Sequence, residues 1–180
     1  MLAQKRRWLH DGWMGFGLTA LVLLPLVTAA EPITTLPHQP DDIRQYQAEA
    51  RKGKFWDQAI LGYLYDMGVG VPQDHVEAVK WYTKAAEQGL AEAQYNLAGV
   101  YSDGRGVRRD YAKAYFWVNI AVTLDPSNPI ARVEGRTEPK PEYIKFRDQV
   151  AAKLSPSQLA ASQRRCRQWL SAFEKRKAKK

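Results

Sequence analysis

Residues 58–85 read QAILGYLYDMGVGVPQDHVEAVKWYTKA, and residues 94–121 read QYNLAGVYSDGRGVRRDYAKAYFWVNIA. The two segments align without a gap at a spacing of thirty-six positions, and a fixed period of this size is typical of stacked helical repeats. Most matching residues are small, aromatic or turn-forming, whereas a duplicated catalytic site would repeat His, Cys, Ser or paired carboxylates. The repeat therefore indicates shared packing and loop geometry. The identical pairs are Gln58/Gln94, Leu61/Leu97, Tyr65/Tyr101, Gly68/Gly104, Gly70/Gly106, Val71/Val107, Asp74/Asp110, Ala78/Ala114, Trp81/Trp117 and Ala85/Ala121.

Apolar residues recur at helical spacing through both copies, which predicts two helical hairpins at about 54–89 and 90–124. Asp74 and Asp110 stand at N-cap positions, and Glu77 three residues after Asp74 fits a capping box. The glycines of the loops MGVGVPQD and DGRGVRRD follow a helix, where the chain needs left-handed residues to turn. A dinucleotide-binding motif would instead follow a strand. The expected helices cover residues 54–66, 75–88, 90–102 and 111–124.

Further helices are expected on both sides of the repeats. A short helix begins near Asp41 and ends at Gly53, and a closing pair covers residues 142–153 and 156–173. Ser155, Pro156 and Gln158 form the cap of the last helix. Its buried stripe is expected to contain Leu159, Cys166, Trp169 or Leu170, and Phe173, with Arg164, Arg165 and Arg167 facing outward. Residues 125–141 form a proline-rich insertion with one short helical turn after Pro129; it is either a functional loop or a tolerated surface insertion.

These elements predict an all-α fold, a short α/α superhelix (solenoid) closed by a C-terminal capping helix pair over residues 41–173. One hairpin cannot bury its apolar stripe, so stacking of hairpins must supply the core. The residues expected to pack between helices are Leu61, Tyr65, Trp81, Leu97, Tyr101 and Trp117.

The first thirty residues have the layout of a secretory signal peptide. Lys5, Arg6 and Arg7 precede an uncharged stretch from Gly12 to Ala30, and small residues there allow cleavage after Ala29 or Ala30. An uncleaved anchor remains the alternative, because nineteen uncharged residues can span a bilayer. Residues 31–40 read as a linker. Either way the domain is expected outside the cytoplasm, periplasmic or secreted, or held at the inner membrane.

The chain is basic, with a formal net charge of +8, and much of that charge lies at its end. Residues 174–180, EKRKAKK, are expected to form a solvated basic tail, or one that adheres weakly to an anionic membrane or envelope surface. Nucleic acid is not an expected partner outside the cytoplasm. Cys166 is the only cysteine, so no disulfide can form within the chain, and it is expected to be a small buried residue.

The segments AEQGLAEAQYNLAGVYSDGRGV and YLYDMGVGVPQDHVEAVKWYTKAAEQG resemble the Sel-one-like repeat, a relative of the tetratricopeptide repeat. The resemblance covers residues 54–124 well, and the closing segment RDQVAAKLSPSQLAASQRRCRQWL is similar to one that often follows such repeats in bacterial proteins. It implies a superhelix whose first helices line a concave groove that binds other proteins. Family members with a cysteine pair in each repeat form a subgroup that this chain does not match. The candidate groove residues are Trp56, Tyr63, Asp66, Tyr95 and Asn96, with Trp56 alternatively covered by the preceding helix.

The sequence favours a non-catalytic adaptor or scaffold of the bacterial cell envelope that binds another protein. A membrane-tethered assembly factor is the first alternative, and an envelope hydrolase is the second. No catalytic, metal-binding or cofactor-binding residue is predicted, because His10, His38 and His75 have no partner at ligand spacing and Cys166 has no histidine nearby in sequence.

Overall fold

The computed structural model describes residues 40–127 and 137–179, which form α-helices and no strand, so the all-α prediction is confirmed. The predicted leader (1–30), nearly all of the linker and the helical turn after Pro129 lie outside the described residues. The elements are α1 (Pro40–Arg51), α2 (Phe55–Met67), α3 (His75–Glu87), α4 (Ala91–Asp103), α5 (Tyr111–Leu124), the 3-10 turn η1 (Asp125–Ser127), α7 (Pro141–Ala151) and α8 (Pro156–Lys177).

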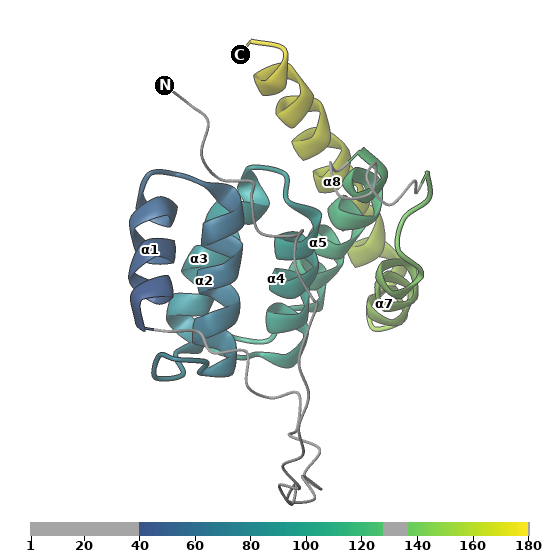
Figure 1. The fold of residues 1–180 in the computed structure, drawn as a ribbon. Helices are drawn as coiled ribbons and strands as arrows, with labels where there is room; N and C mark the ends of the chain where they lie inside the picture. Colours follow the sequence, from purple (N-terminus) through teal and green to yellow (C-terminus); the bar gives the residue numbers. More distant parts are fainter. Residues whose placement is uncertain (1–39, 128–136, 180) are drawn as a thin grey trace, which may run out of the picture. The chain divides into compact units, whose positions relative to one another are not determined.

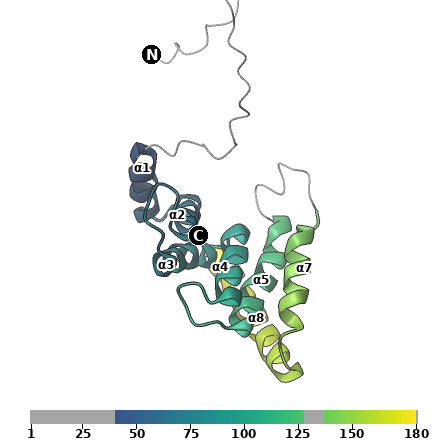
Figure 2. The same ribbon diagram turned by 90° about the horizontal axis from the view of Figure 1, so that it is seen from below.

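Successive helices pack on one another from α1 to α5, so that α2 with α3 and α4 with α5 form the two predicted hairpins (Figure 1). The first helices of the two hairpins, α2 and α4, are also in contact. The closing helices cover the last repeat, as predicted. Each of them packs mainly on α5 and not on the other. Figure 2 shows α7 beside α5.

The repeat extends to hydrogen bonds that hold each hairpin to the helix before it. Gln58 is buried, and its Nε2 donates to the carbonyl oxygen of Ala50 at 3.0 Å. Gln94 is equally buried and donates to the carbonyl of Ala86 at 2.9 Å. Both carbonyls also accept a backbone N–H from the turn that ends the helix, from Gly53 and Gly89 respectively, so each amide adds a second hydrogen bond that links the hairpin to the preceding helix.

The predicted caps form, with one difference. Asp74 accepts a hydrogen bond from the backbone N–H of Glu77, and Asp110 caps α5 in the same way. The reciprocal half of the expected Asp74–Glu77 capping box is absent, because the backbone N–H of Asp74 donates to the carbonyl of Tyr65 at 2.9 Å. The Glu77 carboxylate pairs with Lys80 instead. At α8 the box is complete, with Ser155 and Gln158 bonding to each other's backbone.

The predicted packing residues all belong to the core. The two leucines are completely buried, Trp81 is buried, and the remaining three aromatic side chains are half-buried against the same clusters. They are Leu61, Leu97, Trp81, Tyr65, Tyr101 and Trp117. This arrangement confirms that stacking of the hairpins, and not either hairpin alone, buries the apolar stripe.

Helix α8 ends one turn later than the sequence predicts. It continues to Lys177, so the first part of the expected basic tail is helical. Lysine and arginine in a last turn are stabilised by the negative end of the helix dipole, which favours this extension. Cys166 is buried, as expected, and the three arginines around it are exposed. Within the described ranges, no helix is both long and apolar enough to cross a membrane.

Candidate partner-binding surface

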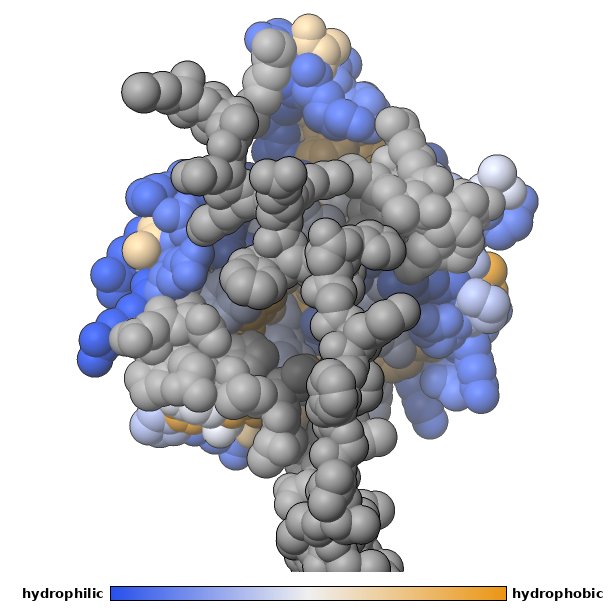
Figure 3. All heavy atoms as spheres, viewed as in Figure 1, coloured by the Kyte–Doolittle hydropathy of each residue, from blue (hydrophilic) through white to orange (hydrophobic). Residues whose placement is uncertain are grey.

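Three large hydrophobic side chains stay exposed on the described part of the chain, and each lies within three positions of buried Asp66 or next to its partner His75. Tyr63 and Met67 are each 49% exposed and lie one turn apart on α2. Val76, 52% exposed, follows His75 at the start of α3. Elsewhere, the described surface that faces the viewer in Figure 3 is mostly hydrophilic. We refer to Tyr63, Asp66, Met67, His75, Val76 and Arg105 as the Asp66 patch.

Asp66 contacts side chains from two other segments of the patch. Its carboxylate accepts a hydrogen bond from His75 Nδ1 at 2.9 Å and forms an ion pair with Arg105 from the loop before α5. Asp66 is only 3% exposed, so its charge depends on these two partners. Burial acts to lower the pKa of Arg105, but the hydrogen bond and charge of Asp66 outweigh it and raise that pKa. The two repeats are therefore joined by the ion pair between Asp66 and Arg105.

Tyr82 lies behind the patch. The groups that change the pKa of its hydroxyl include three of the predicted groove residues. Burial of its ring is the main cause that raises the pKa of Tyr82, and the negative charge of Asp66 adds to it. Arg105 and a side-chain hydrogen bond with Asn96 act in the opposite direction, while Tyr63 raises the pKa further. Three predicted groove residues, Tyr63, Asp66 and Asn96, thus act on the pKa of one hydroxyl group.

The other two predicted groove residues serve packing. The Tyr95 ring is stacked on Tyr143 of α7, with centroids 4.5 Å apart, and Phe146 approaches its face edge-on at 5.5 Å. Trp56 is half-buried against the cluster formed by α3 and α4. Its ring centroid lies 5.3 Å from that of Phe55. Neither aromatic ring presents its full surface to a partner.

Arg105, His75 and Met67 were missed as surface residues by reasoning from the sequence. The sequence does mark Arg105 as unusual, because position 105 carries a charge where the first repeat has Val69. Asp66 likewise corresponds to Ser102 in the second repeat. Charged residues at unmatched positions of a repeat are candidates for contacts between repeats, and this pair spans thirty-nine positions.

The groups with potential for catalysis are held in structural roles. Burial raises the pKa of the Cys166 thiol to about 11, and the thiol donates to the carbonyl of Phe116 at 3.5 Å. Such a thiol is protonated at neutral pH and is a poor nucleophile. His75 is engaged with Asp66. No group of three His, Cys, Asp or Glu side chains within residues 40–127 and 137–179 is arranged to hold a metal ion.

A family model described as Sel1 repeat matches residues 58–90 and 91–125. These bounds begin four residues and one residue later than the repeats expected from the sequence, and they cover the same two hairpins. No curated protein matches the chain. Sel1 repeats are generally scaffolds for protein–protein interaction and are typically non-catalytic.

Several solved structures are similar to the chain, including the following two. One is c5321, described as a protective antigen present in uropathogenic Escherichia coli strains that displays an SLR fold; it is 30% identical, with a TM-score of 0.65 over 74% of this chain. This chain spans 26% of the length of c5321. The other is a Sel1 repeat protein from Oxalobacter formigenes, which is 38% identical over 47% of this chain and 64% of its own, with a TM-score of 0.46.

Proposed function

Residues 58–125 contain two Sel1 repeats, and from this premise we propose that the chain is a non-catalytic scaffold of the bacterial cell envelope that binds another protein through the Asp66 patch. The observation that carries the proposal is the grouping of Tyr63, Met67 and Val76 around a buried ion pair. Exposed apolar side chains at the centre of a charged rim are the usual composition of a binding hot spot.

The chemistry of the patch supports a protein ligand. Tyrosine combines a large apolar ring with a hydroxyl, and methionine adapts its shape to different partners. His75 and Arg105 are held in place by Asp66, so they lose little conformational entropy when a partner binds. Removal of the Tyr63 ring is expected to weaken binding by about 2 kcal/mol, a typical value for a central aromatic residue.

A photo-cross-linking phenylalanine analogue at Tyr63 tests the proposal in cells. The matched control carries the analogue at Ser171, which is exposed on α8 away from the patch. We expect a discrete cross-linked product from position 63 that is absent from position 171 and is lost when Met67→Asp is added. The same products from both positions, or none from position 63, would show that the patch is not the binding surface.

Export is part of the proposal and rests on residues 1–30. A basic start followed by an uncharged apolar stretch supports passage through the inner membrane. The alternative, a membrane-tethered assembly factor, requires this segment to stay attached. Fractionation followed by N-terminal sequencing separates the two, because a mature chain that begins at Ala30 or Glu31 excludes the tether.

The basic end of α8 suggests a second, weaker contact. Lys175, Arg176 and Lys177 lie in the last turn and are exposed, so they are available to an anionic membrane or envelope surface. Such a contact predicts binding to vesicles that contain phosphatidylglycerol and release by salt. A variant with all three residues changed to Gln that binds the vesicles equally well would remove this part of the proposal.

A further inference from the structure

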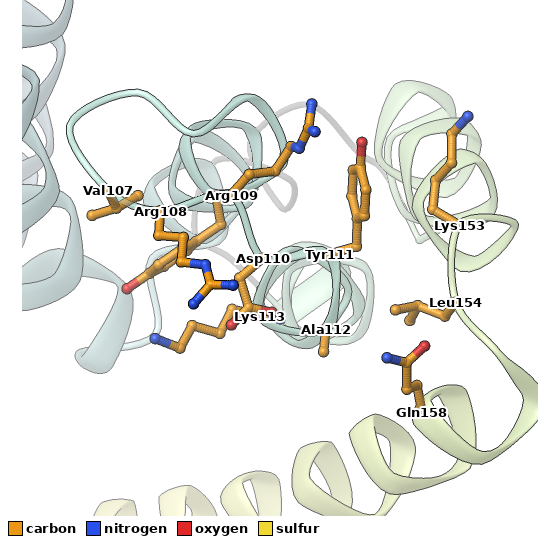
Figure 4. A pocket seen from close by; sticks show the side chains of 11 residues that line it. Val107, Arg108, Arg109, Asp110, Tyr111, Ala112, Lys113, Lys153, Leu154 and Gln158 are labelled. Atoms are coloured by element: carbon orange, nitrogen blue, oxygen red, sulfur yellow. Dashed lines mark hydrogen bonds between the residues drawn. The ribbon is translucent and has the colours of Figure 1, made fainter.

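A cavity of about 600 Å³ opens between the loop that precedes α5 and the turn that joins α7 to α8. Figure 4 shows its side chains arriving from both sides: Arg108, Arg109 and Lys113 come from the loop and the start of α5, and Lys153 comes from the end of α7. Asp110 is the single carboxylate among the lining residues. The cavity is therefore strongly cationic.

The positive charges of this cavity are not neutralised within the described part of the chain. None of the four cations has a carboxylate partner there, since Asp110 uses its side chain to cap α5. Two of the cations lie over aromatic rings instead: Arg109 is 5.7 Å from the centroid of Tyr111, and Lys113 is 5.1 Å from that of Tyr101. Such stacking holds a cation in place and leaves its N–H groups available to an anion.

We infer that this cationic cavity binds an acidic peptide segment of a partner protein. The inference extends the proposed scaffold role to a second surface, because the cavity shares no lining residue with the Asp66 patch. Carboxylate side chains complement the four cations, and Arg binds them through paired hydrogen bonds. Val107 and Leu154, which also line the cavity, provide apolar walls for a side chain between the acidic residues.

Two other anionic ligands fit the cavity less well. A single phosphate is best held by free backbone N–H groups at a helix start, but Asp110 places a carboxylate at the start of α5, and Asp110 and Ser155 each already accept one N–H of their helix. A membrane presents a broad, flat array of charges, whereas these cations belong to the lining of a concavity. An extended chain that carries several carboxylates matches both the spread of the cations and the volume.

The test uses the full chain and a fluorescent peptide with the sequence Glu-Glu-Leu-Glu-Glu, with a Gln-Gln-Leu-Gln-Gln peptide as its neutral counterpart. Fluorescence anisotropy is expected to show binding of the acidic peptide only, weakened by salt. The double variant Arg108→Gln/Arg109→Gln is expected to lower the affinity about tenfold or more, because charged hydrogen bonds are lost. Lys153→Gln tests the α7 side independently and should weaken binding as well.

The matched control is Arg164→Gln/Arg167→Gln, which removes the same charge from two exposed arginines of α8 that do not line the cavity. An equal loss in this control would mean that the peptide responds only to net charge, and would overturn the inference. If inorganic phosphate displaces the peptide at equal concentration, the cavity is assigned to phosphate instead. If Arg108→Gln/Arg109→Gln weakens binding to phosphatidylglycerol vesicles as much as binding to the peptide, the cavity is assigned to a membrane surface instead. Absence of peptide binding would also refute it. Tyr63→Ala should leave peptide affinity unchanged, so failure here is distinct from failure of the Asp66 patch.

Discussion

The substitution Gly62→Ala separates the effect of helix propensity from that of packing. Alanine stands at the equivalent position of the second repeat, Ala98, so the sequence alone favours the change. In the structure, however, Gly62 faces the ring of Tyr82, which is 1% exposed. A Cβ atom at position 62 would lie 2.5 Å from one ring carbon of Tyr82 and 2.7 Å and 2.9 Å from two others. The second repeat avoids this clash because Val118 replaces the tyrosine.

The two effects have opposite signs. Replacing glycine by alanine inside a helix gains about 1 kcal/mol in the free energy of unfolding. Overpacking a buried site costs about 1–3 kcal/mol, and contacts this short with a ring held by its surroundings belong to the upper part of that range. We therefore expect Gly62→Ala to lower the free energy of unfolding by about 1–2 kcal/mol, and Tm by roughly 2–6 °C.

Urea and thermal unfolding followed by circular dichroism measure this change. Gly99→Ala is the control, because a Cβ there meets only the far end of Arg105, at 3.7 Å, and should stabilise α4 by up to about 1 kcal/mol. In a Tyr82→Val background, Gly62→Ala should no longer destabilise, as a double-mutant cycle would show. If Gly62→Ala is as stable as the wild type in the presence of Tyr82, the packing argument is refuted.

Three further predictions concern buried polar groups. Gln58→Leu should destabilise the fold by about 1–2 kcal/mol more than Gln94→Leu in urea unfolding. The reason is that both the Nε2 and the Oε1 of Gln58 form hydrogen bonds, whereas Gln94 Oε1 is buried without a partner among the described residues. An equal loss of stability in the two variants would contradict this prediction. Arg105→Gln should cost about 1–3 kcal/mol, because it removes the positive charge that pairs with buried Asp66. Arg108→Gln serves as its control, because Arg108 is exposed and has no carboxylate partner among the described residues. Alkylation of Cys166 by iodoacetamide should be very slow at pH 8 in the folded protein and fast in denaturant, and rapid labelling of the native chain at pH 8 would show that the thiol is not buried. The pKa of the thiol in the folded chain, about 11, lies above the ordinary value of 9.0. The contribution of the thiol to stability is therefore present below pH 9 and is lost as the pH rises toward 11.

Much of the fold was predictable because its signals are local. The helix boundaries follow from apolar spacing, glycines and caps, and in the repeats the observed bounds differ from the expected ones by at most one residue. The cap formed by Ser155 and Gln158 is a contact between residues three positions apart, so no knowledge of the rest of the fold was required. The exception, α8, ended later because its last turn is stabilised by charge and not by an apolar stripe.

The surroundings of the candidate groove residues were less predictable, because they depend on distant segments. Tyr63 is exposed and Asp66 is buried, whereas the Tyr95 ring is stacked on Tyr143 from α7, forty-eight positions later. The sequence contains no sign that α7 would place Tyr143 against Tyr95, since an insertion separates it from the repeats. The turn that follows α7 also contributes Lys153 to the lining of the cationic cavity, which otherwise comes largely from the loop before α5 and the start of α5.

The sequence by itself determined that the chain is a stack of two helical hairpins with closing helices, because periodicity and capping act between residues a few positions apart. Only the tertiary structure decided which side chains remain exposed, which carboxylate is buried and which cations share a cavity. These outcomes depend on how the helices pack across thirty to fifty positions, and packing is decided by the shapes of side chains that meet only when the chain has folded.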